Sequence, residues 1–329
     1  MNILIVAPAW VGDMVMAHTL VQLLLQEQPG VEIDLLCPPA TAALGSRMPG
    51  VRDVHLLTVG HGELGIGERW RTGRALPAYE QAILLPNTIK SALVPLFAGI
   101  PKRTGWVGES RYGLLNDVRK LDKDAYALMI ERFMALGLPE GAALPEPYPQ
   151  PRLTADADGA RALAERLQLR VDQPVAVLCP GAEFGPAKQW PEASYAEVAR
   201  HLAANGHSVW LMGSPKDEAV CAEIAALAGH AHVVSCAGQT SLVEAVDLMS
   251  LAAVVITNDS GLMHVAAALD IRIVAVYGST SPDFTPPLQD DAQIVRLGLD
   301  CSPCFKRECP LGHLDCLRKL PAERVIACL

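Results

Sequence analysis

The segment VAVLCPGAEFGPAKQWP, residues 175–191, decides the fold class of this 329-residue chain. Its first four residues are apolar, which is typical of a parallel strand buried on both faces. Gly181 and Gly185 then let the backbone approach a ligand closely, and Lys188 adds a positive charge. Loops of this kind, at the carboxyl ends of parallel strands, bind nucleotides and phosphates. On spacing alone, an ordinary strand-to-helix connection is the alternative.

Strand-like and helix-like segments alternate along both halves of the chain. In the first half the pattern predicts strands over residues 3–6, 32–37 and 81–85 and a helix over 14–25. In the second half it predicts strands over 175–178, 208–212 and 253–257 and near residue 233, with helices over 157–167, 194–204, 217–228 and 242–251. This alternation predicts an α/β fold with parallel, doubly wound sheets.

The length and a proline-rich segment predict two domains. A chain of 329 residues with 50% hydrophobic content exceeds the size at which one core usually stops growing. Five prolines lie between residues 139 and 151, where the periodicity stops, and they mark a linker. We therefore expect one domain over 1–150 and a second over 151–320.

The charge and hydropathy of the chain exclude some classes of partner. The net charge of −9 argues against general binding to nucleic acid or to an anionic membrane surface. No apolar stretch approaches the ~20 residues that span a bilayer, and the start MNILIVAPAW has no basic leader, so we expect a cytoplasmic protein. Residues 69–123 carry ten Lys or Arg against four acids, which suits a phosphorylated or carboxylated ligand or, alternatively, a solvated helical face.

A second motif, TNDSGLMHVAAAL at residues 257–269, follows a predicted strand. Ser260 and Gly261 begin a predicted helix, whose unpaired N–H groups and dipole form an anion site. In the alternative interpretation, Asp259 and Ser260 are a simple helix cap and His264 is an ordinary helix residue.

In the first half, the loop APAWVGDMVM at residues 7–16 follows the first strand. It lacks the G-x-G-x-x-G pattern, so a dinucleotide site there is not expected. Gly12 permits close approach, and Asp13 stands at the start of the predicted helix. An Asp at such a position is also a common helix cap.

These motifs resemble those of the ADP-heptose:lipopolysaccharide heptosyltransferases, and the string GAEFGPAKQWP is similar to that of the type II enzymes, which add the second heptose of the inner core. The resemblance covers almost the whole chain. It implies the GT-B architecture, in which two Rossmann-like domains face a central cleft. It also implies that the segment 321–329 folds back onto the first domain.

The resemblance further implies the roles of individual residues. The donor, ADP-heptose, is expected to contact Gly181, Lys188, Gly213, Glu218, Asp259, Ser260, Gly261 and His264. Glu218 would bind the ribose hydroxyls, although an acidic residue in a first helical turn needs no ligand. Lys188 would stabilise the leaving diphosphate and Asp13 would take the proton of the acceptor hydroxyl, with no cofactor.

The acceptor site is expected at Gly12, Asn87, Lys90 and Arg103. The last three lie in the segment LPNTIKSALVPLFAGIPKRTGW, residues 85–106, which also looks like the family's first domain. Lys90 could equally belong to the exposed face of an amphipathic helix.

The implied reaction is an inverting transfer to heptosyl-Kdo2-lipid A at the inner face of the cytoplasmic membrane. Three alternatives stay open. They are a type I enzyme acting on Kdo, a hydrolysing nucleotide-sugar epimerase of the same architecture, and a non-catalytic binding protein that uses its cysteines.

Four cysteines near the end of the chain could supply a metal site. Cys301, Cys304, Cys309 and Cys316, with His313 between them, are enough ligands for structural zinc or an iron–sulfur cluster. Their spacing matches neither of the common patterns. We therefore expect ordinary thiols and no metal, with a structural site as the alternative.

Overall fold

The protein is described by a computed structural model that covers residues 1–60 and 62–329. It divides into two compact units, residues 1–153 and 154–329. The division falls between Leu153 and Thr154, just beyond the proline-rich segment and close to the boundary expected after residue 150.

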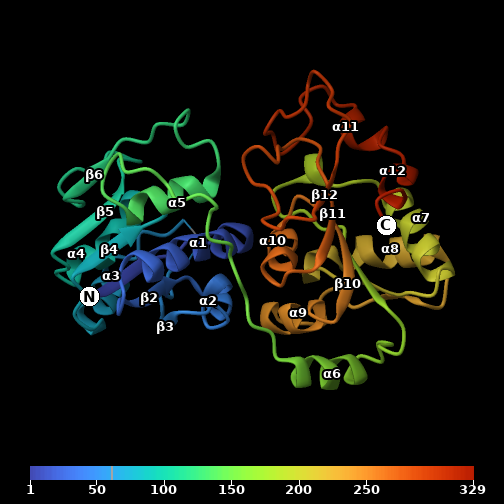
Figure 1. Ribbon diagram of the computed structural model, residues 1–329, viewed down its shortest axis with the longest axis horizontal. Helices are drawn as coiled ribbons and strands as arrows, with labels where there is room; N and C mark the ends of the chain where they lie inside the picture. The colour runs from blue at the N-terminus through green and yellow to red at the C-terminus, as the bar shows by residue number, and fades with distance from the viewer. Residues whose placement is uncertain (61) are drawn as a thin grey trace. The chain divides into compact units, whose positions relative to one another are not determined.

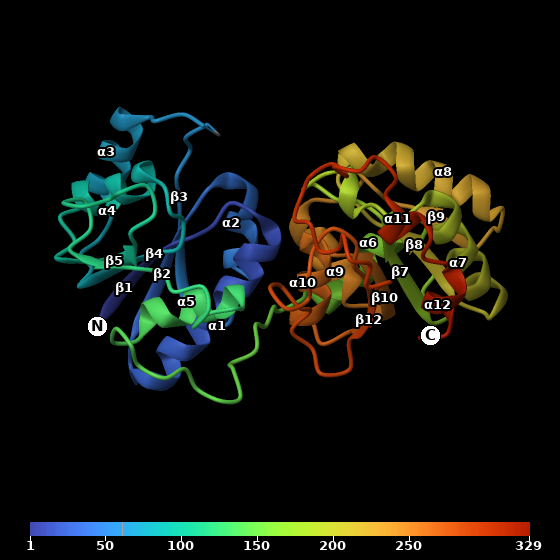
Figure 2. The same cartoon turned by 90° about the horizontal axis from the view of Figure 1, so that it is seen from above.

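The first unit is a six-stranded, all-parallel sheet in the order β3-β2-β1-β4-β5-β6 (Figure 1). Its strands are β1 (Asn2–Val6), β2 (Glu32–Cys37), β3 (Val51–Leu56), β4 (Gln81–Leu84), β5 (Lys102–Trp106) and β6 (Asp117–Arg119). Its helices are α1 (Val11–Glu27), α2 (Pro39–Gly45), α3 (Ile66–Ala75), η1 (Ile89–Ala92), α4 (Leu93–Phe97) and α5 (Met129–Gly137). Helices α1 and α5 cover one face of the sheet, and α3 and α4 cover the other (Figure 2).

The second unit repeats this plan with a sheet in the order β12-β11-β10-β7-β8-β9, again all parallel. Its strands are β7 (Val175–Cys179), β8 (Ser208–Leu211), β9 (Val233–Ser235), β10 (Ala252–Asn258), β11 (Arg272–Val276) and β12 (Gln293–Val295). Its helices are α6 (Ala157–Arg166), η2 (Pro186–Lys188), α7 (Glu192–Ala204), η3 (Pro215–Asp217), α8 (Glu218–Ala228), α9 (Leu242–Met249), α10 (Gly261–Ala268), α11 (Asp315–Arg318) and α12 (Ala322–Ile326). Counted from β7 as its first strand, this sheet has the same order as the first one, 3-2-1-4-5-6.

The predicted pair of doubly wound parallel sheets is confirmed. Each segment predicted as a strand or helix forms that element, with ends within a few residues of those expected. The strands that were not predicted are mostly short or polar. β6 and β12 have three residues each, and the VRDVHL sequence of β3 lacks a continuous apolar run.

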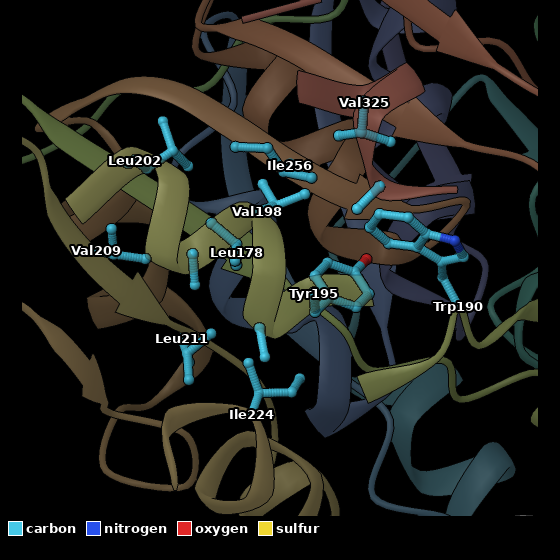
Figure 3. Packing of buried hydrophobic residues seen from close by; sticks show 14 of the residues in the cluster. Leu178, Trp190, Tyr195, Val198, Leu202, Val209, Leu211, Ile224, Ile256 and Val325 are labelled. Atoms are coloured by element: carbon cyan, nitrogen blue, oxygen red, sulfur yellow. The ribbon is translucent and has the colours of Figure 1, made fainter. Parts of the chain in front are cut away.

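The continuous apolar run of β7 is explained by its place in the sheet. β7 pairs with β8 on one side and β10 on the other, and all five of its residues are buried. Its Leu178 packs with Trp190 and Tyr195, whose rings meet edge to face at 5.1 Å (Figure 3). The loop after β7 therefore begins and ends in the core of the second unit.

The C-terminal segment corrects one prediction. Residues 321–329 belong to the second unit, where Val325 of α12 is buried in the core beside α7 (Figure 3). Trp190 Nε1 donates to the Leu320 carbonyl at 3.0 Å, and Arg272 donates to the carbonyl of Leu329 at 2.9 Å. The expectation that this segment packs on the first domain is wrong, because its apolar face is buried against α7.

None of the helices in the described part of the chain is both long and apolar enough to cross a membrane.

Candidate functional site

Each sheet has one point at which the strand order reverses, and the candidate residues gather at these points. In the first unit the reversal lies between β1 and β4, and in the second between β7 and β10. We call the carboxyl ends of these pairs, with the loops that follow them, the first and second switch points. In open α/β sheets, ligands bind in the crevice outside such strand ends.

The second switch point holds a buried ion pair. Lys188 in η2, from the loop after β7, places Nζ 2.6 Å from Oδ2 of Asp259, which follows β10. The two side chains are only 15% and 5% exposed, so the pair is largely removed from water. Breaking a buried pair by removing one partner is strongly destabilising, whereas an anionic ligand can share the lysine. The parallel topology brings the two motifs together although they lie 71 residues apart.

Asn258, the last residue of β10, fixes the loop that carries Lys188. Its Nδ2 donates to the Pro180 carbonyl at 2.6 Å. Its Oδ1 accepts hydrogen bonds from the Trp190 backbone N–H at 3.3 Å and from the Tyr195 hydroxyl at 3.0 Å. One fully buried amide thus binds both ends of the loop, and the next residue along the chain is Asp259.

The start of α10 offers backbone donors beside this pair. In the described chain, the Ser260 side chain makes no capping hydrogen bond to α10 and lies 3.2 Å from the Thr257 hydroxyl instead. Ser260 thus has the N-cap position that the simple-cap interpretation expects, but its side chain does not satisfy the helix N–H groups. The first N–H groups of α10, from Gly261 onward, keep their capacity for an anion.

His264 lies in α10 near the ion pair and is 4% exposed. Burial lowers the pKa of His264 to about 4; Asp259 opposes this shift and Lys188 adds to it. The imidazole is therefore neutral at pH 7, so it can form hydrogen bonds to a ligand but adds no positive charge.

The carboxyl ends of β7 and β8 bring two predicted glycines to one carboxylate. A Cβ on Gly181 would lie 2.5 Å from Asp217 Oδ1, and one on Gly213 would lie 2.7 Å from Asp217 Cβ. Asp217 accepts hydrogen bonds from the Ser214 N–H at 2.8 Å and hydroxyl at 2.7 Å. Glu218, the first residue of α8, is exposed and lies against Gly238, where its carboxylate is accessible to a ligand.

The four late cysteines line one cavity. Cys301, Cys304, Cys309 and Cys316 surround it together with His313, and Ala187 and Ser279 complete part of the wall. Hydrogen bonds from the backbone N–H of Leu314, and also of Leu311, Gly312 and His313, lower the pKa of the Cys309 thiol. Burial raises the pKa of Cys316. No three His, Cys, Asp or Glu side chains among the described residues are arranged to hold a metal ion.

The first switch point holds the predicted acid. Trp10 is the N-cap of α1, so Gly12 and Asp13 are its second and third helical residues. Asp13 is half-buried in the first turn, where the helix dipole favours a negative charge. The alternative in which Asp13 is the helix cap is wrong, because the cap position belongs to Trp10.

The loop after β4 brings Asn87 and Lys90 to the same edge, since Val6 of β1 pairs with Leu84 of β4. Lys90 lies in the 3-10 helix η1. Because η1 runs directly into α4, Lys90 lies in a helical turn, and its alternative interpretation stays open. Asn87 is exposed.

The buried side chain of Arg111 fixes the loop after β4. This residue was not identified from the sequence. Its guanidinium is fully buried and donates to the Pro86 carbonyl at 2.8 Å, to the Ser91 hydroxyl at 3.1 Å and to the Trp106 carbonyl at 2.5 Å. Burial lowers the pKa of Arg111 to about 10, so the group remains charged at pH 7. Arg111 thus fixes the loop at the first switch point, as Asn258 fixes the loop at the second.

Arg103 is not brought to this edge, which corrects the predicted acceptor set. It is the second residue of β5 and pairs with Ala82, near the amino ends of both strands. Its guanidinium donates to the carbonyls of Leu114 at 2.7 Å and Ile100 at 2.6 Å. These contacts explain Arg103 as a residue that joins loops at the opposite end of the strands.

Comparison with known proteins shows which proteins this chain resembles. The family model of glycosyltransferase family 9 (heptosyltransferase) matches residues 69–315, which is more than half of the chain. Lipopolysaccharide heptosyltransferase 2 of Salmonella typhimurium is 44% identical over 99% of this chain and 97% of its own length.

Two solved structures extend the comparison. That of ADP-heptose lipopolysaccharide heptosyltransferase II from Escherichia coli has a TM-score of 0.89 and 42% identity, over 100% of this chain and 97% of that one. The Escherichia coli heptosyltransferase WaaC with ADP has a TM-score of 0.73 and 21% identity, over 99% of this chain and 98% of that one, and shows a shared fold.

Proposed function

Because the chain belongs to glycosyltransferase family 9, the heptosyltransferase family, we propose that its two switch points divide the two substrates of the transfer between them. The chain is a glycosyltransferase that transfers heptose in the biosynthesis of the lipopolysaccharide inner core. In our proposal the second switch point binds the donor and the first binds the acceptor. The observation that carries it is the buried pair of Lys188 and Asp259 at the ends of β7 and β10.

The donor is ADP-heptose, and its diphosphate lies at the second switch point. Lys188 and the N–H groups at the start of α10 are donors suited to phosphate oxygens. Glu218 accepts hydrogen bonds from the ribose hydroxyls, and Gly181 and Gly213 let Asp217 pack closely between the ends of β7 and β8 beside the nucleotide. ADP is bound by the related WaaC enzyme, as is ADP-2-deoxy-2-fluoro heptose, which supports this choice of donor.

Positive charge from the protein stabilises the leaving group. As the bond from the anomeric carbon to the diphosphate breaks, negative charge grows on the diphosphate oxygens. Lys188 and the α10 dipole are already oriented toward that charge, so they stabilise the transition state more than the bound donor. Asp259 holds the lysine in place, and neutral His264 can donate a hydrogen bond to the sugar or the diphosphate.

At the first switch point, Asp13 is the general base. Its carboxylate accepts the proton of the acceptor hydroxyl while the oxygen of that hydroxyl attacks the anomeric carbon. The electron pair of the breaking bond leaves with ADP. Attack from the face opposite ADP inverts the configuration of the anomeric carbon. Gly12, Asn87 and Lys90 lie at the same edge and hold the acceptor.

The acceptor is heptosyl-Kdo2-lipid A, at the inner face of the cytoplasmic membrane. This choice follows the similarity to type 2 enzymes along the whole chain, in contrast to an enzyme that adds the first heptose to Kdo.

Mass spectrometry distinguishes these acceptors. The enzyme is incubated with ADP-heptose and with lipid A that carries either Kdo alone or Kdo with one heptose. We expect a mass increase of one heptose only on the heptose-bearing acceptor. Transfer to the Kdo acceptor alone would contradict the proposed acceptor. Epimerisation of the donor without any acceptor would contradict transfer as the main reaction.

A further inference from the structure

The loop between β7 and α7 contacts Arg307, a cation that lies outside the two motifs at residues 175–191 and 257–269. The ring of Phe184 lies 5.1 Å from Lys188 Nζ and 5.5 Å from the Arg307 guanidinium carbon, both measured to the ring centroid. Cations at such distances are attracted by the aromatic face. Phe184 therefore makes cation–π contacts with both Lys188 and Arg307, which lie far apart in the sequence.

The backbone of Arg307 is fixed to the same loop. The Ala187 N–H donates to the Arg307 carbonyl at 3.0 Å. Gly185 approaches so closely that a Cβ on it would lie 2.6 Å from that carbonyl oxygen. The position of Arg307 relative to Lys188 is therefore set by main-chain contacts as well as by Phe184.

The charges around the loop leave Arg307 as a cation that is available to a ligand. Lys188 is paired with Asp259, and Lys216 is paired with Glu183. His264 is neutral because its pKa is lowered to about 4. Arg307 is exposed and has no carboxylate partner among the residues that the structure describes.

A diphosphate needs more positive charge than the predicted site supplies. ADP-heptose carries one negative charge on each of its two phosphates. The pair of Lys188 and Asp259 is neutral as a whole, and the start of α10 contributes only about half a positive charge. A second side-chain cation at this edge would bring the site close to neutrality. A guanidinium also binds phosphate oxygens through two parallel N–H donors.

We propose that Arg307 is a further donor-binding residue, which binds the diphosphate of ADP-heptose together with Lys188. The proposal rests on the donor site assigned above. Arg307 lies within the cysteine segment, and the cavity lined by that segment also contains Ala187, whose N–H binds the Arg307 carbonyl.

Calorimetric titration with ADP and AMP tests this role. Arg307→Ala keeps the main-chain contacts and removes the cation, so we expect about tenfold weaker ADP binding, the low end for a charge-assisted contact at an exposed group. AMP lacks the second phosphate and should lose less, so the preference for ADP over AMP should shrink. Arg307→Lys should restore part of the affinity, and Lys306→Ala, the neighbouring exposed cation, should bind ADP within about twofold of the parent.

Lys188→Ala is titrated in parallel to separate the two proposals. If Lys188→Ala weakens ADP binding and Arg307→Ala does not, the donor site stands and the role of Arg307 is refuted. Equal losses for ADP and AMP in Arg307→Ala would also refute it, because the second phosphate would then not be its target. If only Arg307→Ala weakens ADP binding, Arg307 binds the diphosphate and the role assigned to Lys188 is wrong.

Discussion

The two sheets share one strand order, but the loops at their switch points are built differently. The second switch point carries a buried ion pair, an uncapped helix start and a loop whose two ends are bound by Asn258. The first carries an acid in the first turn of α1 and a loop held by the buried Arg111. The same topology thus carries an ion pair and an uncapped helix start at one switch point, and a carboxylate in the first turn of a helix at the other.

This difference follows from what each edge must do in the proposed reaction. A departing diphosphate needs fixed donors and cations, which cost no reorganisation if they are already held in place. A general base needs a carboxylate that is ionised at neutral pH and reaches a hydroxyl. The comparison predicts that substitutions at the two switch points affect different steps.

The largest effect is expected at the first switch point, for Asp13→Asn. The amide cannot accept the acceptor's proton, so we expect kcat to fall by about 10²–10⁴-fold. ADP affinity should stay unchanged, since the donor residues lie in the other unit. Initial rates and ADP titration measure the two effects. Glu27→Gln, an exposed acid at the end of the same helix, serves as the control. Near-normal turnover in Asp13→Asn would contradict the assignment of Asp13 as the general base.

Lys188→Ala should give the next largest effect and the opposite pattern. Loss of a charge-assisted contact to the diphosphate is worth about 1.5–3 kcal/mol, so ADP affinity should fall roughly 10- to 150-fold. The melting temperature should fall too, because Asp259 is left buried without its cation. Lys216→Ala removes an exposed lysine near the same edge and should change ADP affinity little. Unchanged ADP binding in Lys188→Ala would contradict the proposal that Lys188 binds the donor at the second switch point.

Asn258→Ala tests whether the loop must be held at both ends. The substitution leaves the Pro180 carbonyl, the Trp190 N–H and the Tyr195 hydroxyl without their shared partner. We expect the free energy of unfolding to fall by about 2–3 kcal/mol, measured by urea denaturation. ADP affinity should fall at a temperature where the variant is still folded. Full ADP affinity in a destabilised variant would show that Asn258 stabilises the core without positioning Lys188.

The smallest effect concerns pH and His264. The unfolded chain protonates this histidine below about pH 6.5, whereas the folded protein does so only near its lowered pKa of about 4. Stability is therefore complete above pH 6.5 and is lost as the pH falls toward 4. Between pH 7 and pH 5 this amounts to about 2 kcal/mol.

His264→Gln removes this titration, so the difference in unfolding free energy between the parent and the variant should change by that amount over this pH range. A difference that does not vary with pH would mean that His264 is accessible to protons in the folded protein.

The sequence predicts the strands that carry both switch points. In a parallel sheet, the loops that follow neighbouring strands lie at the same edge. The strand of residues 175–178 and the strand before Asp259 were both predicted, and since the structure pairs them, their following loops meet at one edge. The functions expected for Lys188 and Asp259 rest on the family resemblance, and the topology explains why the two residues meet. The same holds for Asp13 and Asn87, at the ends of β1 and β4.

What could not be predicted depends on contacts between distant segments. Nothing in the sequence around Asn258 shows that its side chain binds both Pro180 and Trp190. Arg103 was expected at the acceptor site from the family resemblance, and without a prediction of β5 its position near the amino end of that strand was not apparent. For α12, the apolar positions indicate a buried face but not the surface against which it packs.

Hydrogen exchange with and without ADP tests the division of substrates most directly. Exchange of backbone amides is followed by mass spectrometry in peptides that cover both switch points. The account predicts that ADP slows exchange in residues 181–190 and 258–264 of the second unit and leaves residues 7–16 and 85–92 of the first unchanged. Protection of residues 7–16 by ADP, or no protection of residues 181–190, would contradict it.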